Sequence, residues 1–551
     1  MTAITQTCRD CKHSFVITEE DQAFYAKMDV LMPSSCPACR SQQRMSWRNE
    51  RNLYHRKCDL CAKAIISTYH SESPYTVYCQ TCFWGDGWNA LDFGRDIEWH
   101  RPMFEQIQDL QLKVPRLAIV NKESQNSDYC NYSFANKNSY LCFGSHYEQD
   151  CLYSEYSTQN LNCVDSTCMY KSTSCYECLY SKNCTRSVYL DHCETSRECY
   201  FSIDLKDCEH CLFSANLRHK KYYIFNQAYS KEEYFKKLAE YRLSDYTGFQ
   251  HALRYFSTDF RFQFPRQANH QTNCENCEGS THSNSKNLRF CFDSTDCEDC
   301  AYGSQMDRTK NSMDTDFMGY DPCELSHQSI GCAGTYNCLS CESCWHDSDL
   351  AYCQLCFSSK DCFASIGLRQ KQYCILNKEY SKIDYENLKL RLIEKMKQRG
   401  EWGEFFPSEL SPFAYNQTMA ATHFPLSKEA ATAQGFRWFD DEGQDYQGPV
   451  VTLPDSLSDI PKDITQKILR CEVSGKLYKI TPHELEFYLD MKIPLPRRCP
   501  EQRYNDRVKR CCPRKFWDRA CGECGISIQT TYSPDRPEKV LCEECYLKTV
   551  Y

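Results

Sequence analysis

The chain of 551 residues contains no run of 18 apolar residues, which excludes an ordinary transmembrane helix. Its first residues, MTAITQTC, lack the basic start and the apolar stretch of a secretory signal peptide. We therefore expect a cytoplasmic protein that does not bind membranes. The chain also has fewer positive than negative residues: 65 lysines and arginines against 74 aspartates and glutamates give a formal net charge of −9. A chain this acidic is not attracted to nucleic acid as a whole, so such binding needs a local basic patch.

Cysteine is the residue in excess, at 42 copies. Such a count is typical of disulfide-rich proteins outside the cell or of metal sites inside it. Near both ends the cysteines form CxxC pairs, and two such pairs aim four sulfurs at one tetrahedral zinc ion. Four thiolates leave no position for a catalytic water, so structural sites are expected. The predicted zinc ligands are Cys8, Cys11, Cys36, Cys39, Cys58, Cys61, Cys79, Cys82, Cys521, Cys524, Cys542 and Cys545.

The C-terminal end repeats the N-terminal end at an offset of 463 residues without a gap. The second four-cysteine set of this copy is intact. The first set is damaged, because Ser474 and Gln502 stand where the N-terminal copy has Cys11 and Cys39. Serine and glutamine are poor zinc ligands.

Two explanations of the damaged set remain open. Either neighbouring cysteines complete a remodelled metal site, or the metal is lost and packing holds the unit. We favour loss, because a remodelled site requires the ligand geometry to be rebuilt. The expected cofactor is three Zn²⁺ ions, or four if the remodelled site forms. The sulfurs of that site would belong to Cys471, Cys499, Cys511 and Cys512.

The first cysteine set resembles a probable zinc-ribbon family. Its signature is a CxxC pair, an F-x-I-T-x-E segment, a short helix and P-x-x-C-P-x-C-R, which here run from Cys8 to Arg40. Thr18 and Asp21 form a capping-box variant that begins the helix. The resemblance implies zinc binding and little more. The complete layout also resembles uncharacterised cysteine-rich bacterial zinc-ribbon proteins, which implies no activity.

A further helix is predicted to begin at the second CxxC pair, and arginines recur along it at steps of three and four residues. Guanidinium groups on one helical face match the phosphate oxygens of a partner. The alternative is a solvated or ion-paired face, docked on the acidic middle of the same chain. The candidate partner-binding residues are Arg40, Arg44, Arg48 and Arg51, with Arg503, Arg507, Arg510 and Arg514 in the second copy.

The middle of the chain repeats a Cys-x-x-Ser element, and many successive cysteines are 12 residues apart. Tyrosine, phenylalanine and serine favour strands, and asparagine, aspartate and glycine favour the turns between them. A short fixed period predicts a β-solenoid whose narrow core holds stacked cysteines. Two coil lengths are compatible with this period: one coil contains either one period of 12 residues or two periods, roughly 24 residues. We prefer two, because the core is then wider.

This region is duplicated as well, since residues 216–235 match residues 367–386 at an offset of 151. Ser230 and Glu233 form a capping box that predicts a helix over 231–243, and Ser381 precedes a longer helix that ends near 398. Each helix is expected to close a solenoid, because an open end exposes apolar core and unpaired strand edges.

The central cysteines allow three kinds of chemistry: metal binding, disulfide formation or a redox cycle. Histidine is sparse, at 15 residues, and the cysteine spacing is repetitive. Buried, reduced cysteines in a stacked core are therefore the preferred interpretation.

The predicted fold class is mainly β with short helices: duplicated zinc-ribbon or treble-clef-like modules flank two cysteine-rich β-solenoids, each closed by a helix. The predicted domains are zinc module 1a (1–57), module 1b and linker (58–127), solenoid A (128–245), solenoid B (246–398), an aromatic strap (399–469), the degenerate module 2a (470–519) and module 2b (520–551).

This layout favours a non-enzymatic zinc-binding scaffold that docks a protein or ribonucleoprotein through its arginine-bearing helices. One alternative is a metal-handling or redox protein that uses the central cysteines. Another is a nucleic-acid-binding protein that uses its many tyrosines. No pattern in the sequence indicates a small-molecule substrate.

Overall fold

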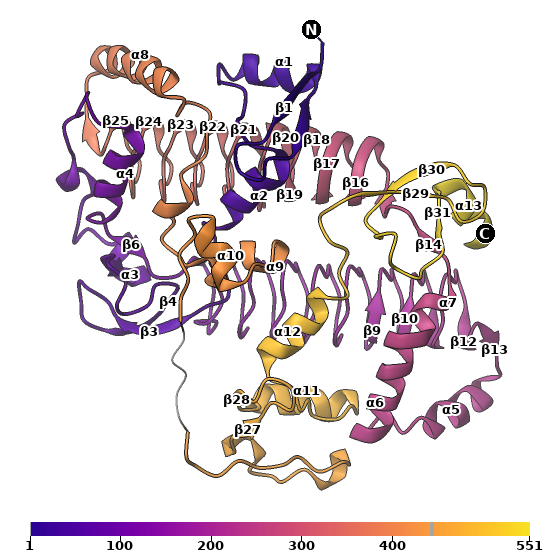
Figure 1. The fold of residues 1–551 in the computed structure, drawn as a ribbon. Helices are drawn as coiled ribbons and strands as arrows, with labels where there is room; N and C mark the ends of the chain where they lie inside the picture. The colour runs from indigo at the N-terminus through magenta and orange to yellow at the C-terminus, as the bar shows by residue number, and fades with distance from the viewer. Residues whose placement is uncertain (1, 441–445, 551) are drawn as a thin grey trace. The chain divides into compact units, whose positions relative to one another are not determined.

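The computed structural model describes residues 2–440 and 446–550. The chain is mainly β, with short helices and several cysteine-rich modules, as predicted. It divides into two compact units, and each unit is built from two separate segments (Figure 1). Unit 1 contains the described residues up to 119 and those from 270 to 440, and unit 2 contains residues 120–269 and those from 446 onward. Each unit thus combines the zinc modules of one end of the chain with one repetitive segment.

Unit 1 begins with hairpins and short helices, continues into a long sheet and ends in helices. Its zinc-module elements are β1 (Ile4–Thr7), β2 (Ser14–Ile17), α1 (Glu19–Lys27), α2 (Pro37–Met45), β3 (Tyr54–Lys57), β4 (Ala64–Ser67), β5 (Val77–Tyr78), α3 (Gln80–Trp84), α4 (Met103–Gln111) and β6 (Arg116–Leu117). Its sheet contains β15 (Gln271–Thr272), β16 (Glu275–Ser283), β17 (Lys286–Thr295), β18 (Glu298–Ala301), β19 (Ser304–Asp307), β20 (Thr309–Met313), β21 (Cys323–His327), β22 (Tyr336–Leu339), β23 (Ser348–Ala351), β24 (Lys360–Phe363), β25 (Gln372–Ile375) and β26 (Lys378–Glu379). Its later helices are α8 (Lys382–Arg399), α9 (Met419–His423) and α10 (Lys428–Ala433).

Unit 2 has the same kinds of element in a different order along the chain. Its first segment contains β7 (Asn121–Lys122), β8 (Ser133–Phe134), β9 (Val188–Asp191), β10 (Tyr200–Ile203), β11 (Glu209–Leu212), β12 (Lys221–Ile224), β13 (Gln227–Ala228), α5 (Lys231–Glu240), α6 (Tyr246–Tyr255), α7 (Arg261–Gln263) and β14 (Arg266–Gln267). Its second segment contains β27 (Leu469–Arg470), β28 (Leu477–Tyr478), α11 (Pro482–Met491), α12 (Pro500–Val508), β29 (Trp517–Ala520), β30 (Ser527–Thr530), β31 (Val540–Leu541) and α13 (Glu543–Val550).

The repetitive segments pair with themselves in parallel. We name residues 121–224 ladder A and residues 271–375 ladder B. In ladder A each pairing residue lies opposite the residue 12 positions later, and four such bridges occur in each repeat, as at Asn131↔Phe143 and Phe134↔His146. Figure 1 shows the repeats of each ladder stacked side by side. The preferred repeat of two periods was wrong, because the pairing step is a single period of 12 residues.

A three-residue unit inside each repeat explains the short step. One residue pairs with the next repeat, the second has a positive φ angle, and the third points inward, as in Leu152, Tyr153 and Ser154. Residues other than glycine at positive φ carry a penalty of roughly 1–2 kcal/mol each. Backbone hydrogen bonds to both neighbouring repeats offset this penalty: Leu152 donates to Cys163 and Tyr153 donates to Tyr140.

The inward positions explain why cysteine and serine dominate. The Cys142 thiol donates to the carbonyl oxygens of Tyr140 and Cys151 at 3.7 and 3.3 Å. The Ser139 hydroxyl accepts from the backbone N–H of Cys151, which lies in the next repeat. A small side chain that both donates and accepts therefore satisfies backbone groups that would otherwise be buried without a partner. The Cys-x-x-Ser element is two successive inward positions.

The end of each ladder is closed by the same local structure in the two units. In ladder A the Asn226 amide exchanges two hydrogen bonds with the backbone of Ala215, and in ladder B Asn377 does the same with Ile366. The capping box of Ser230 is present, and α5 runs from Lys231 to Glu240, three residues shorter than predicted. The longer helix α8 begins after its N-cap Ser381, as expected.

The cores lie between the ladders and the helices of the zinc modules. In unit 2 Tyr176 of ladder A packs against Tyr488 of α11, with ring centroids 5.5 Å apart. In unit 1 Tyr25 of α1 packs with Met313 of ladder B. Residues 441–445 of the predicted strap lie outside the described part of the chain. Among the described residues, no helix combines the length and the apolar character needed to cross a bilayer.

Glu148 occupies an inward position of ladder A and gives a pH-dependent prediction. Its Oε1 accepts from Asn160 at 2.9 Å, and its Oε2 has no hydrogen-bond partner among the described residues. Burial, with a contribution from the nearby Cys163, raises the pKa of Glu148 to about 8. The unfolded chain releases this proton above pH ~4.3, so the free energy of unfolding falls as the pH rises towards 8.

We expect Glu148→Gln to remove this dependence, since a neutral amide has no proton to lose. In urea unfolding, the stability of the variant relative to the natural protein should rise by about 2 kcal/mol between pH 6 and pH 8. The exposed Glu123→Gln exchange is the control and should leave the pH profile unchanged. Parallel profiles for Glu148→Gln and the natural protein would contradict the prediction.

Candidate metal centres

The first cysteine set is assembled by a hairpin and a helix start. Cys8 and Cys11 lie at the turn between β1 and β2, where Lys12 takes a positive φ of 63°. Cys36 is the N-cap of α2, and Cys39 lies in its first turn. The Cys36 backbone N–H donates to the Cys8 sulfur at 3.2 Å, which ties the start of the helix to the hairpin.

Three sets of four cysteines can each hold a metal ion. Within every set the four sulfurs lie within 4.8 Å of one another, and these sets contain all twelve predicted ligands. One sulfur–sulfur distance in each set is 3.7 Å between Cys11 and Cys36, 3.9 Å between Cys61 and Cys79 and 3.8 Å between Cys524 and Cys542. A tetrahedral zinc with Zn–S bonds of about 2.3 Å needs sulfurs about 3.8 Å apart. The geometry therefore fits three Zn²⁺ ions.

The degenerate set does not form a fourth site of this kind. The Ser474 hydroxyl takes the place of a sulfur and lies 3.6 Å from the Cys499 sulfur. Cys512 packs elsewhere, against Tyr532 and Val540 of module 2b. Among the described residues, the remodelled set of Cys471, Cys499, Cys511 and Cys512 is not one of the groups that could hold a metal ion.

The arginines of α2 are buried in unit 1, not exposed. Arg40 is 2% exposed and Arg44 is fully buried. The Arg40 guanidinium lies 2.9 Å from the Asp314 carboxylate of ladder B. Arg44 lies 3.2 Å from Asp314 and 2.8 Å from Asp316. The helix that follows the second CxxC pair is thus fixed to the ladder by ion pairs.

The arginines of α12 make the matching contacts in unit 2. Arg503 and Arg507 lie 3.1 and 2.7 Å from the Asp165 carboxylate of ladder A. Arg507 also lies 3.4 Å from Glu177. Arg510 makes a further ion pair with Glu177.

These two clusters correspond residue by residue. At the offset of 463 between the zinc modules, Arg40 corresponds to Arg503 and Arg44 to Arg507. The ladders have their own offset, which is 149 up to Asp314 and 151 from Cys323 onward, because ladder B has two extra residues between β20 and β21. The same offsets relate Asp314 to Asp165, Gln328 to Glu177 and Tyr302 to Tyr153. Arg44 donates to the carbonyl of Tyr302, and Arg507 donates to that of Tyr153.

A third buried arginine follows the same rule. Arg116 of β6 donates to the Tyr69 hydroxyl at 2.8 Å and lies 3.7 Å from Glu342 of ladder B. Arg266 of β14 lies 3.8 Å from Asp191 of ladder A. Asp191 and Glu342 correspond at the offset of 151. Buried arginines therefore join one ladder in each unit both to the zinc modules and to the strand that pairs with them.

The partner-binding prediction is wrong for the buried arginines. Arg40, Arg44 and Arg48 in unit 1 are at most 5% exposed, and so are Arg503 and Arg507 in unit 2. The predicted partner is replaced by carboxylates of the same chain, as the alternative interpretation had it. The arginines that are not fully buried are Arg51, Arg510 and Arg514.

Burial and ion pairing act in opposite directions on these carboxylates. Burial opposes ionisation of Asp314, but Arg40 and Arg44 outweigh it and hold the pKa of its carboxyl below the usual range. At Glu177 burial prevails over Arg510 and Arg507 and raises the pKa to about 6. The arginines therefore favour the charged form of both carboxylates against burial.

The central cysteines are mostly inward-facing and carry free thiols. Burial raises the pKa of Cys193 and of Cys300 well above the ordinary thiol value. Cys168, Cys274 and Cys277 are partly exposed. No cluster of three or more metal-ligating side chains is found in the ladders, within the described residues.

Sequence reasoning missed the acidic half of each cluster. Asp165 is the only acidic residue between Glu155 and Glu177, whereas Asp314 lies close to Asp316, so local composition does not mark the two positions as equivalent. A signal was nevertheless present: both aspartates correspond within the ladder duplication, as both arginine pairs correspond within the module duplication.

Comparison with protein families agrees with this geometry. Residues 4–48 match the family described as a probable treble clef domain. A treble clef domain combines a hairpin that carries two zinc ligands with a helix that carries the other two, as β1, β2 and α2 do here. A treble clef domain binds zinc, so the prediction of a zinc-binding N-terminus is confirmed. A search of curated proteins finds no match to the chain.

Proposed function

We propose that the protein is a non-enzymatic, zinc-dependent scaffold of the reducing cytoplasm that docks a partner protein. In this proposal the two ladders are β-solenoids of 12-residue coils, and the zinc modules hold them in shape. The observation that carries the proposal is the same arginine–carboxylate cluster in both units, since it links each zinc module to its own ladder.

This link gives zinc a structural role. The metal fixes the hairpin to the start of α2, and α2 places Arg40 and Arg44 against Asp314. Four thiolates leave no ligand position for water or substrate. A protein partner is favoured over nucleic acid, because the main basic clusters are neutralised inside the units and the net charge of the chain is −9.

Metal handling or redox chemistry by the central cysteines is the alternative to separate from this proposal. Alkylation of the native, zinc-loaded protein with iodoacetamide, followed by peptide mass spectrometry, distinguishes the two. We expect labelling of Cys274 and Cys277 and protection of Cys151, Cys193 and Cys300, because inward thiols are inaccessible and hydrogen bonded. Elemental analysis should give three zinc ions per chain.

Rapid labelling of the three inward thiols, or metal well above three equivalents, would favour the redox or metal-handling alternative. The docking part of the proposal has its own test. Affinity purification of the full chain from its native cells should recover a partner with the zinc-loaded protein and lose that partner after chelation. Recovery that does not depend on zinc would contradict the scaffold role of the zinc modules.

A further inference from the structure

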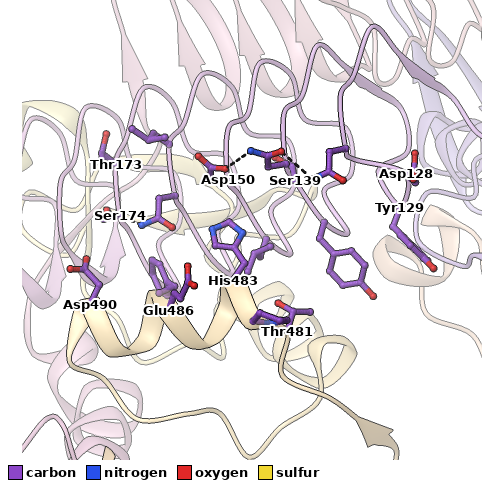
Figure 2. Close-up of a pocket in the computed structure, with 18 residues that line it drawn as sticks. Asp128, Tyr129, Ser139, Asp150, Thr173, Ser174, Thr481, His483, Glu486 and Asp490 are labelled. Carbon is purple, nitrogen blue, oxygen red and sulfur yellow. Dashed lines mark hydrogen bonds between the residues drawn. The ribbon is translucent and has the colours of Figure 1, made fainter. Parts of the chain in front are cut away.

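Unit 2 contains a groove whose lining side chains differ in part from those at the corresponding positions of unit 1. The groove has a volume of about 980 Å³ and runs between α11 and one edge of ladder A (Figure 2). Among the lining residues of the ladder edge, five stand at the same position of five successive repeats. These residues are Asn126, Asn138, Asp150, Asn162 and Ser174.

The ladder edge is rigid and polar. The Asn126 amide donates to Asn138 at 3.1 Å, and the Asn138 amide donates to Asp150 at 3.0 Å. All of these residues have positive φ, a conformation that asparagine and aspartate tolerate better than most residues. The hydrogen-bonded row thus holds the side chains in a fixed line along the groove.

The opposite wall of the groove is acidic. Figure 2 shows His483, Glu486 and Asp490 on α11 facing the ladder edge. Asp490 pairs with Arg186 at 2.8 Å, and Arg186 stands at the position of Ser174 in the next repeat. In the described part of the chain no lysine or arginine lies within 4.0 Å of the carboxylates of Asp128, Asp150 or Glu486. Three lining carboxylates therefore lack a cationic partner.

The other end of the groove is aromatic. Tyr129 and Tyr140 line it, with their rings 5.1 Å apart in an edge-to-face arrangement. Tyrosine rings attract guanidinium and ammonium groups through cation–π contacts. Carboxylates and tyrosines together are the groups that arginine and lysine side chains prefer, and they repel a phosphate backbone.

The duplication shows which part of this wall is particular to unit 2. Asn138, Asp150 and Asn162 correspond to Asn287, Asp299 and Asn311 of ladder B, where Asn287 donates to Asp299 at 2.8 Å. The row is thus present in both units. The helix differs, because the positions of Glu486 and Asp490 are Ala23 and Lys27 in α1. Each helix carries three carboxylates, but in α1 they are Glu19, Glu20 and Asp21 of the first turn, whereas in α11 Glu486 and Asp490 lie further along the helix, where they line the groove.

We propose that this groove binds an extended, arginine- and lysine-rich peptide segment of a partner protein. Four repeat steps of about 4.8 Å give a length of about 19 Å, which accommodates about six residues of extended peptide. Carboxylates of the groove receive the basic side chains, and Tyr129 and Tyr140 receive one at the open end. The inference rests on the proposed scaffold function and assigns one docking site to it.

The test uses the full-length zinc-loaded protein and three labelled eight-residue peptides in which serine alternates with arginine, glutamine or glutamate. Fluorescence anisotropy should detect binding of the arginine peptide only. Glu486→Lys should weaken this binding by about tenfold or more, since it places a cation in the groove. Ala23→Lys, which places a lysine at the corresponding exposed position of unit 1, should change the affinity by less than about twofold.

Three outcomes would overturn the inference: unchanged affinity of Glu486→Lys, equal loss in Glu486→Lys and Ala23→Lys, or equal binding of the glutamate peptide. A single-stranded oligothymidine serves as the nucleic-acid probe, and its displacement of the arginine peptide from this groove would also count against the inference. Hydrogen exchange separates folding from binding, because both variants should keep the protection of α11. If the peptide test fails while zinc-dependent partner recovery persists, the groove assignment falls and the scaffold function stands.

Discussion

Arg44→Met is expected to loosen ladder B and to leave ladder A unchanged, although ladder A is the closer of the two in sequence. Removal of Arg44 leaves Asp316 without its ion pair, and Asp314 keeps Arg40 and the imidazole of His327, whose pKa burial lowers to about 4. An uncompensated buried carboxylate destabilises a protein by about 3–5 kcal/mol. Hydrogen exchange followed by mass spectrometry should therefore show faster exchange in residues 300–340.

Arg507→Met should give the reciprocal result. It removes the closest ion pair of Asp165 and one of those of Glu177, so residues 150–180 should exchange faster while residues 300–340 do not change. Arg197→Met is the matched control, because Arg197 pairs with Glu209 on the surface and is 57% exposed, and exposed pairs contribute about 0–1 kcal/mol. Faster exchange of ladder A in Arg44→Met would contradict the assignment of residues to units.

Removal of zinc from the first site is expected to have the largest effect on unit 1. Structural zinc contributes on the order of 10 kcal/mol to the folding of small modules. Cys36→Ser with Cys39→Ser should reduce the zinc content from three ions to two and release α2 together with Arg40 and Arg44. Thermal unfolding of unit 1 should then begin at a much lower temperature than that of unit 2.

The degenerate module supplies the matched control. Cys471→Ser with Cys499→Ser alters corresponding half-sites, and we expect the zinc content to stay at three ions, because these thiols face Ser474 and lie in the core of unit 2. Elemental analysis and calorimetry of the two double variants provide the comparison. A drop in zinc for the Cys471 and Cys499 variant would show that the degenerate set still binds metal. Disulfide-linked peptides from Cys8 or Cys36 in the native protein would contradict the zinc sites themselves.

Covalent spacing made the zinc sites predictable. A CxxC pair encodes its own geometry, so the ligands could be assigned from the sequence, and the capping boxes at Thr18 and Ser230 fixed two helix starts in the same local way. The role of the arginines on the helix after the second CxxC pair could not be predicted from the sequence in the same way. A solvated arginine and a buried one such as Arg44 have the same sequence pattern, and only tertiary contacts decide which charge lies opposite.

The period of 12 residues was visible, but the three-residue unit within it was not. Tyr153, Lys171 and Glu177 all adopt positive φ, a conformation that none of them favours by itself. Their conformation is imposed by hydrogen bonds to neighbouring repeats, and a single sequence carries little trace of that constraint. The grouping of segments into units is likewise invisible locally, because it depends on which ladder carries the matching carboxylates.

The order of segments along the chain bears on how the protein is made. Translation proceeds from the N-terminus, and domains commonly fold as soon as their residues have left the ribosome. Here the first zinc modules must wait for ladder B and α8 before unit 1 is complete, while ladder A must wait for the last zinc modules. Unit 1 needs residues as far as α8 and unit 2 needs α12, so both should finish late in synthesis. Ribosome-bound chains should expose the Asp165 carboxylate of ladder A until Arg503 and Arg507 of α12 have emerged.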